Sequence, residues 1–324
     1  DYMFRMQIQS KKKCIWYCSA AVSFLLFLLL NLWCDHLVNM QDAQQMAGRW
    51  SEKKDVAQVS CFFSSKAEVT EDTIQSFEYS LKNVLQEASI TETSENPSAR
   101  LWVDAYSADG KITLVNGRNT LDANAIGIGG DFFLFHPLKL ITGSYFSGND
   151  LMQDYCIIDQ DAAWQLFGSN DVVGMTVYIG NVPHIVTGVV RRPQGRMEKA
   201  AGLTSTVVYV SYETLEAYGT NNGINHYEIV MPNPVDEFAY GKVKEGIGID
   251  EKNVEIVENS RRYSLPNRIK TILAFGTRSM NGKAIIYPYW ENLARGYEDI
   301  IALLTGVMLL LLLYPVVTVI WCFV

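Results

Sequence analysis

Cysteine is scarce in the part of the chain where a disulfide framework would be needed. Four of the six cysteines lie in or beside two apolar runs near the chain ends, namely Cys14, Cys18, Cys34 and Cys322. Only Cys61 and Cys156 lie between the runs, each in a strand-like apolar stretch. A disulfide-scaffold protein is therefore excluded. A Cys61–Cys156 bridge stays open for an oxidising compartment, but we expect two buried thiols and no essential disulfide.

The sequence also lacks the motifs that would mark it as an enzyme or a nucleic-acid-binding protein. Its net charge is -8, and no stripe of Lys and Arg alternates with aromatic residues, so nucleic acid is a poor partner. No GxxxxGK[ST] string is present to cradle a nucleotide, and HExxH, CxxC and GxSxG are missing too. The glycine-rich stretch 127–131 does not follow the GxGxxG pattern of a dinucleotide site, and we interpret it as a turn.

Histidine is the remaining candidate for site chemistry, and there are only four. They are far apart in the sequence, at His36, His136, His184 and His226. We expect each to be hydrogen-bonded or exposed and not to bind metal. The sequence thus assigns no catalytic, metal or cofactor-binding residue and implies no cofactor. No motif identifies residues that bind a substrate.

Two long apolar runs are the strongest positive signal. The run 14–34 and the run 300–324 contain no formally charged residue, and each is long enough as a helix to cross a bilayer of about 30 Å. We predict a transmembrane helix at each. A cleaved signal peptide is the alternative for the first run, but the residues after it lack the small-x-small pattern of a cleavage site.

The flanking charges predict the orientation of these helices. Lys11, Lys12 and Lys13 precede the first run, whereas no Lys or Arg lies between its end and Arg49. Positive charge favours the cytoplasmic side, so 1–13 should be a basic cytoplasmic stub and 35–299 an extracytoplasmic domain. We expect a multi-pass protein of the cell membrane.

Periodicity in the region between the runs predicts an α+β domain with mostly antiparallel strands. Residues 71–88 carry apolar side chains at helical spacing behind an N-cap at Thr70. The other expected features are a helical stalk at 40–54, a strand at 56–63, a loop at 92–98, a hairpin within 101–117 turning at Asp109-Gly110, a strand and helix at 156–167, a hairpin at 176–190 turning at Gly180-Asn181, and a strand and helix at 206–218.

Five segments of the domain occur in an order that resembles a known family. They are AIGIGGDFF at 125–133, LITGSYFSGND at 140–150, CIID at 156–159, LFGSNDVVG at 166–174 and VYIGNVPHIVTGVV at 177–190. This order is similar to that in the periplasmic core domain of MacB-like ABC transporter permeases, also called FtsX-like permeases. LFGSNDVVG followed by a hairpin ending in TGVV is the most specific part. The Gly-Arg that usually precedes the family's Phe is replaced here, since Ser144 and Tyr145 precede Phe146.

The resemblance implies a fold and a function. The domain would have a porter-like α/β lobe and an inserted, mainly β lobe at about 110–205. The chain would be a permease that dimerises with a second copy or paralogue in the lipid bilayer and couples to a separate cytoplasmic ATPase subunit. Such systems export or extract antibiotics, peptides or lipoproteins. Because family members have four membrane helices, we interpret this chain as the first half of such a permease or as a reduced partner protein.

Two other classes remain as alternatives. A two-helix sensor or receptor would bind a ligand outside and signal inward, and a membrane-tethered enzyme would carry a catalytic site. Only about thirteen residues precede the first helix, which leaves no room there for an output module, and the motif absences count against an enzyme. A permease is therefore the expected function.

Overall fold

The computed structural model describes the backbone of residues 2–51, 55–91, 100–275 and 284–323. The predicted loop at 92–98 lies outside these residues. The chain divides into two units, which are described separately. A helical unit comprises Asp1–Gln41, Tyr263–Ser279 and Arg295–Val324, and a globular unit comprises Asp42–Arg262 and Met280–Ala294.

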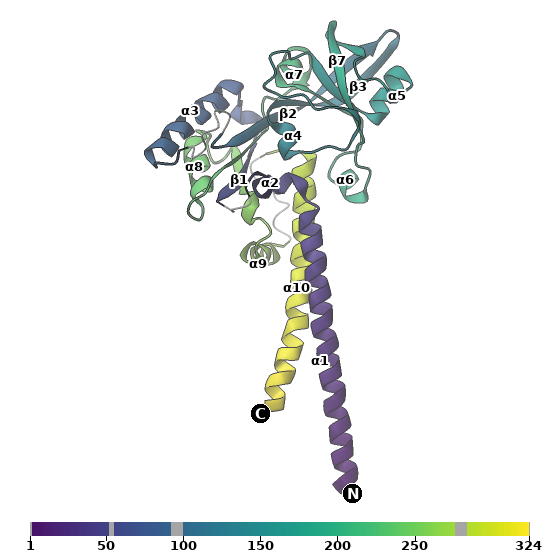
Figure 1. Ribbon diagram of the computed structural model, residues 1–324, viewed down its shortest axis with the longest axis vertical. Coiled ribbons are helices and arrows are strands. Elements are labelled where there is room, and N and C mark those ends of the chain that lie inside the picture. The colour runs from purple at the N-terminus through teal and green to yellow at the C-terminus, as the bar shows by residue number, and fades with distance from the viewer. Residues whose placement is uncertain (1, 52–54, 92–99, 276–283, 324) are drawn as a thin grey trace. The chain divides into compact units, whose positions relative to one another are not determined.

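The order of elements in the described residues mixes helices and strands throughout (Figure 1). The α-helices are α1 (Tyr2–Asn39), α2 (Met46–Trp50), α3 (Glu71–Glu87), α4 (Phe132–Phe135), α5 (Gln160–Phe167), α6 (Arg196–Ala200), α7 (Tyr212–Tyr218), α8 (Phe238–Gly246), α9 (Leu265–Leu273) and α10 (Tyr289–Phe323). Short 3₁₀ turns are η1 (Asp42–Gln44), η2 (Ser65–Ala67) and η3 (Asn259–Arg261).

One twisted sheet runs through the globular unit. Its strands are β1 (Val56–Phe63), β2 (Val103–Asn116), β3 (Asn119–Gly130), β4 (Leu140–Gly143), β5 (Tyr155–Asp159), β6 (Thr176–Ile179), β7 (Val182–Val190), β8 (Val207–Ser211), β9 (Thr220–Asn221), β10 (His226–Pro232) and β11 (Val254–Glu258). The main order is β11-β1-β10-β2-β3-β8-β5-β7-β4, with β6 and β9 pairing on β2. Among the strand pairs of the described residues, β3 with β8 and β5 with β7 are parallel and the others are antiparallel, which confirms the predicted α+β class.

The long β2–β3 hairpin joins two groups of strands. On one side lie β10, β1 and β11 with α3 and α8, and on the other lie β8, β5, β7 and β4 with α5 and α7 (Figure 1). This arrangement accords with a two-lobed domain. The expected limits of the inserted lobe, at about 110–205, stay a prediction.

Side-chain alternation separates the two faces of β1 and β10. Cys61 and Tyr227 point into the main core, whereas Ser60 and Glu228, which face each other across the strands, lie on the opposite face. A second core on that opposite side includes Phe132, Val230 and Trp290. One face of these strands is therefore apolar, and the other carries buried polar residues.

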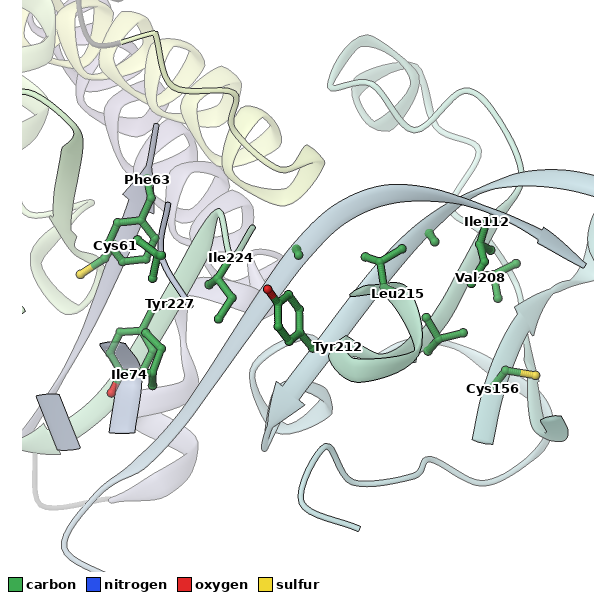
Figure 2. Packing of buried hydrophobic residues seen from close by; sticks show 14 of the residues in the cluster. Cys61, Phe63, Ile74, Ile112, Cys156, Val208, Tyr212, Leu215, Ile224 and Tyr227 are labelled. Atoms are coloured by element: carbon green, nitrogen blue, oxygen red, sulfur yellow. The ribbon is translucent and has the colours of Figure 1, made fainter. Parts of the chain in front are cut away.

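The main core extends along the sheet, as Figure 2 shows. Cys61 and Cys156 sit toward opposite ends of the labelled cluster, on β1 and β5, and both are free thiols. Burial raises the pKa of each, that of Cys156 to about 12, so neither thiolate forms readily. These cysteines serve as small apolar side chains in the core.

The predicted hairpin turn at Asp109-Gly110 is wrong. These residues lie inside β2, and the chain turns at Gly117, where φ is +60°. Asp109 is not a turn residue because its buried carboxylate accepts a hydrogen bond from Asn225 Nδ2 at 2.8 Å. Gly110 is required by packing, since a Cβ there would lie 2.4 Å from the carbonyl oxygen of Thr220.

The interpretation of 127–131 as a turn is also wrong, because β3 continues to Gly130. The glycines make room for neighbouring side chains: a Cβ on Gly129 would lie 2.0 Å from Cζ of Tyr106. The helical stalk expected at 40–54 is not formed either. Helix α1 ends at Asn39, and η1 and α2 follow it.

The other expected elements are confirmed, within a few residues of their predicted limits. They are β1, α3, the β5–α5 pair, the β6–β7 hairpin and the β8–α7 pair. Thr70 and Thr73 form a reciprocal capping box at the start of α3. Asn181 adopts a left-handed conformation with φ of +67°, as its hairpin turn requires.

In the helical unit, α1 and α10 lie side by side (Figure 1). Ser23 Oγ donates to the carbonyl oxygen of Leu311 at 2.8 Å, and Ser19 Oγ lies 2.8 Å from the hydroxyl of Tyr314. The Trp16 and Trp321 rings stack at 5.4 Å. Small polar residues let two helices approach closely, and the remaining surface is rich in exposed leucine. Cys14–Asn39 and Tyr289–Trp321 are long and apolar enough to span a membrane.

A pair of carboxyl groups between α3 and β2 should make stability depend on pH. Burial, together with the neighbouring Asp104, raises the pKa of Glu78 to about 8. The folded protein therefore holds a proton that the unfolded chain releases near pH 4.5, so this contribution to stability is complete below pH 4.5 and is lost as pH rises toward 8. We expect Glu78→Gln to raise Tm relative to wild type at pH 8.5 and to change it little at pH 4.5. Thermal melts at both values test this, with exposed Glu87→Gln as the control; equal shifts at both values would contradict it.

Candidate functional site at the start of helix α10

Helix α10 begins inside the globular unit. Its first six residues, Tyr289–Ala294, belong to that unit, and the helix then continues without a break to Phe323 in the helical unit. Trp290 and Glu291 are 5% and 1% exposed. Asn292 Nδ2 donates to the carbonyl oxygen of Ala201 at 3.2 Å. The start of this membrane-type helix is therefore held by side chains of the globular unit.

The strongest contact of this first turn is a buried ion pair between Glu291 and Arg262. The guanidinium donates through Nη1 to Oε2 at 2.7 Å and through Nη2 to Oε1 at 2.8 Å. Both residues are buried, and this two-bond geometry is specific to Arg with a carboxylate. Because each charge compensates the other away from water, the removal of one partner would be costly.

Hydrogen bonds continue from this ion pair to the polar face of the sheet. Arg262 Nη1 also donates to Asn259 Oδ1 at 3.2 Å, and Asn259 Nδ2 donates to Ser60 Oγ at 2.7 Å. Ser60 Oγ in turn donates to Glu228 Oε2 at 3.1 Å. A continuous chain of side-chain contacts thus links the first turn of α10 to β10 through η3 and β1. Buried polar networks of this kind fix the relative position of the elements they join.

Glu228 is the centre of a second group, which contains two histidines. His136 follows α4 as its C-cap and contacts Glu228 Oε1 through Nε2 as an ion pair. His226 lies two residues before Glu228 on the same face of β10, with its Nε2 3.8 Å from Oε2. The three residues are 4%, 1% and 1% exposed in the order His136, His226, Glu228. They are the members of a possible metal-binding group found within the described part of the chain.

The charges in this group follow from burial and mutual contact. Burial lowers the pKa of His226 to about 4, against the opposing effect of Glu228, so this imidazole is neutral at physiological pH. Burial alone would raise the pKa of Glu228, but the two imidazoles and the hydrogen bond from Ser60 hold it below its ordinary value. Gln58 Nε2 adds a further contact to Oε2 at 3.3 Å. Glu228 is therefore a buried carboxylate with several partners.

Trp290 connects the two polar groups to the aromatic core. Its ring centroid lies 4.3 Å from that of His136, 5.4 Å from that of His226 and 5.7 Å from that of Phe132. These distances are typical of favourable aromatic contacts. Glu291 belongs to the ion pair, and its neighbour Trp290 packs against the aromatic core. A displacement of this turn of α10 would therefore disturb both.

Sequence analysis considers the four histidines one by one and does not predict this group. His36 is exposed, and His184 is hydrogen-bonded to Val182 and Thr214, as predicted for each. His136 and His226 are distant in sequence, and the pairing of β10 with β2 and of β2 with β3 brings their segments together. One signal was available, since polar residues occupy every second position at Gln58 and Ser60 in an otherwise apolar strand.

The CIID segment at 156–159 has a structural role. Asp159 accepts hydrogen bonds from the backbone N–H groups of Ala162 at 2.8 Å and Val207 at 3.0 Å, and from Arg192 Nη1 at 2.8 Å. The first of these caps helix α5. Asp159 thereby joins β5, α5 and the start of β8.

Replacement of Asp159 by alanine should lower the free energy of unfolding by about 2–4 kcal/mol, because it removes a helix cap and leaves two further donors without their acceptor. Asp161 is the matched control: it also pairs with Arg192 but its side chain is 47% exposed. Asp161→Ala should cost less than about 1 kcal/mol. Urea titrations of both variants provide the comparison, and equal losses would contradict the part assigned to Asp159.

Comparison with known proteins places this domain in a family. The MacB-like periplasmic core domain matches residues 40–256. The macrolide export ATP-binding/permease protein MacB of Pasteurella multocida is 31% identical over 98 residues, which cover 30% of this chain and 14% of that protein. MacB of Neisseria gonorrhoeae is 36% identical over 80 residues, or 24% of this chain and 12% of its own length. The chain thus spans a small part of these relatives.

Two solved structures are similar to the chain. The extracellular domain of the noncanonic ABC-type transporter YknZ from Gram-positive bacteria overlays with a TM-score of 0.40 at 17% identity, covering 62% of this chain and 99% of that one. The periplasmic region of MacB from Actinobacillus actinomycetemcomitans overlays with a TM-score of 0.40 at 20% identity, covering 63% and 89%. The family match extends over most of the globular unit and includes the segments at 125–190 that first indicated the resemblance. The chain belongs to the MacB-like periplasmic core domain family.

Proposed function

We propose that this chain is the permease subunit of an ABC-type export or mechanotransmission system. A cytoplasmic ATPase subunit would move the membrane helices, and the helices would move the globular domain on the other side of the membrane. The flanking lysines favour a cytoplasmic N-terminus and an extracytoplasmic domain at 35–299. The cargo would belong to the classes inferred from the resemblance, namely antibiotics, peptides or lipoproteins.

The observation that carries this proposal is the continuity of α10. A single helix runs from the buried Arg262–Glu291 pair of the globular unit into an apolar segment long enough to cross the membrane. A rigid helix with an embedded end transmits a displacement of its far end, whereas a flexible linker would absorb it. The buried contacts of Trp290 support the same interpretation.

Family membership supports an ATPase partner. The relatives from Pasteurella multocida and Neisseria gonorrhoeae carry both ATP-binding and permease in their names. We propose that the present chain works with such an ABC ATPase as a separate subunit. We further propose that two permease copies, or a copy and a paralogue, pair in the lipid bilayer.

Co-purification tests the proposal. The full-length protein, expressed with the ABC ATPase encoded nearest to it, should retain that ATPase through affinity and size-exclusion steps in detergent, with two permease chains in each complex. A non-hydrolysing ATPase variant serves as a control for assembly, because it should bind but not turn over ATP. Failure of every neighbouring ATPase to bind would contradict the proposal. A ligand-dependent signal without any ATPase would favour the sensor alternative.

A further inference from the structure

We propose that His136, His226 and Glu228 bind one divalent transition-metal ion, with Zn²⁺ as the expected occupant. This inference does not depend on the permease function, because it rests only on side chains of the globular unit. The ion would join the C-terminal end of α4 to β10 directly beneath Trp290. It would thereby stabilise the packing of α4 and β10 around Trp290, in the first turn of α10.

The first argument is the convergence of three ligand atoms. One ring nitrogen from each histidine and one carboxylate oxygen lie within 4.8 Å of one another. In a tetrahedral zinc site with bonds of about 2.0–2.1 Å, ligand atoms are separated by about 3.4 Å. His226 Nε2 lies 3.8 Å from the Glu228 carboxylate at Oε2, and His136 Nε2 contacts its Oε1, the oxygen that would bind the ion, more closely than a tetrahedral site would. Ion binding would therefore move His136 and the carboxylate apart.

The second argument is that the converging atoms have no hydrogen-bond partners among the described residues. His136 Nε2, His226 Nε2 and Glu228 Oε1 are all buried and unsatisfied. His136 Nε2 and Glu228 Oε1 contact each other as an ion pair, so a metal ion would replace that contact, whereas His226 Nε2 has no hydrogen bond to replace. Buried polar atoms without partners are rare and costly, and metal coordination would satisfy all three at once.

The third argument is that neighbouring residues hydrogen-bond to these ligand side chains and pack against them, and so orient them. Ser107 Oγ lies 3.4 Å from His226 Nδ1, so the opposite nitrogen of that ring is free to present a lone pair. Ser60 and Gln58 donate to Glu228 Oε2 at 3.1 and 3.3 Å, and Phe62 stacks on the His226 ring at 5.1 Å. Outer hydrogen bonds and packing of this kind orient ligands in protein metal sites.

The donor set indicates the class of ion. Two imidazoles and one carboxylate suit Zn²⁺ and related transition metals, whereas Ca²⁺ and Mg²⁺ prefer oxygen ligands alone. Burial of all three side chains means that the ion enters slowly from solution and is acquired best during folding. Loading should therefore be done during expression in zinc-supplemented medium.

Metal analysis of the full-length protein in detergent, purified through a tag without histidine, tests the site. Wild type should hold about one Zn²⁺ per chain, and His226→Ala and Glu228→Gln should reduce this at least about tenfold. Expression with Co²⁺ should give the visible absorption bands of a tetrahedral site, while Ca²⁺ and Mg²⁺ should not be retained. His184→Ala is the matched control, because His184 is also buried but both of its ring nitrogens are hydrogen-bonded. It should keep the metal.

Chelation of the wild-type protein provides a test that needs no variant to fold. Prolonged incubation with phenanthroline should lower Tm by about 5 °C or more, and added Zn²⁺ should restore it. Glu228→Gln keeps the shape of the side chain and should melt at the same temperature with and without chelator. A wild-type protein without stoichiometric metal after zinc loading, or variants that retain the wild-type content, would overturn the proposal and leave a buried His–Glu–His contact alone.

Discussion

Replacing Glu291 with alanine is expected to lower the free energy of unfolding of the globular unit by about 3–5 kcal/mol. The buried Arg262 guanidinium would then lose both of its short hydrogen bonds to this carboxylate, and the removal of one member of a buried ion pair is among the most costly single changes. Urea titrations followed by tryptophan fluorescence measure the loss. Exposed Glu87 at the end of α3 is the control, since Glu87→Ala should change stability by less than about 0.5 kcal/mol.

A double replacement separates the ion pair from the loss of packing. Arg262→Met with Glu291→Met removes both charges and keeps apolar volume, so it should be more stable than either single variant. The difference from additivity should amount to about 2 kcal/mol or more for a buried pair. Additive losses would mean that the two side chains do not depend on each other, contrary to their two short hydrogen bonds.

The second large effect is expected for Trp290→Ala, at about 3–5 kcal/mol. The ring is 5% exposed and packs on His136, His226 and Phe132, so truncation leaves a cavity bordered by rigid rings. Helix α10 would also lose the contact that places its first turn against the second core. Thermal melts and urea titrations on the purified protein provide the measurement.

Trp164 on α5 is the matched control for that substitution, because it is the same residue type with 55% exposure. Trp164→Ala should cost less than about 1 kcal/mol. In the proposed complex with an ATPase subunit, Trp290→Phe should retain the fold and ATP hydrolysis while it reduces transport. Transport at the wild-type level with Trp290→Phe would contradict a role for this turn in coupling.

Local patterns predicted the membrane helices and most elements of the domain. An uncharged run of membrane length has few other interpretations, and the apolar stripe of 71–88 recurs at helical spacing whatever the surroundings. The hairpin turn at Gly180-Asn181 is also predictable from the sequence, because both residues tolerate a positive φ. These elements depend on interactions between residues that are close in sequence.

The errors arose where tertiary contacts overrode local preference. Asp109-Gly110 has the composition of a turn, but Asn225 on the neighbouring segment binds the carboxylate and the close approach of Thr220 requires the glycine. Gly129 is likewise a strand residue because the ring of Tyr106 occupies the space beside it. These contacts are made by residues of other segments, so the residues on either side of each glycine in the sequence do not indicate them.

The candidate site could not be predicted from the sequence, for the same reason. Arg262 and Glu291 carry no motif, and they meet only because η3 and the first turn of α10 are adjacent in the fold. His136 and His226 come from separate elements that pack on one face of the sheet. Gln58 and Ser60 occupy alternate positions of β1, which indicates that one face of this strand carries polar side chains.

Hydrogen–deuterium exchange on the full-length protein, bound in lipid nanodiscs to the ATPase subunit proposed above, tests the central claim, that α10 links ATP turnover to the globular domain. Trapping with ATP and vanadate should change the exchange of peptides covering 226–232 and 284–294, relative to the nucleotide-free complex. The same peptides should lose this response in Trp290→Phe, which keeps the fold. Identical exchange in both nucleotide states, in a complex that hydrolyses ATP and transports its cargo, would contradict coupling through the start of α10.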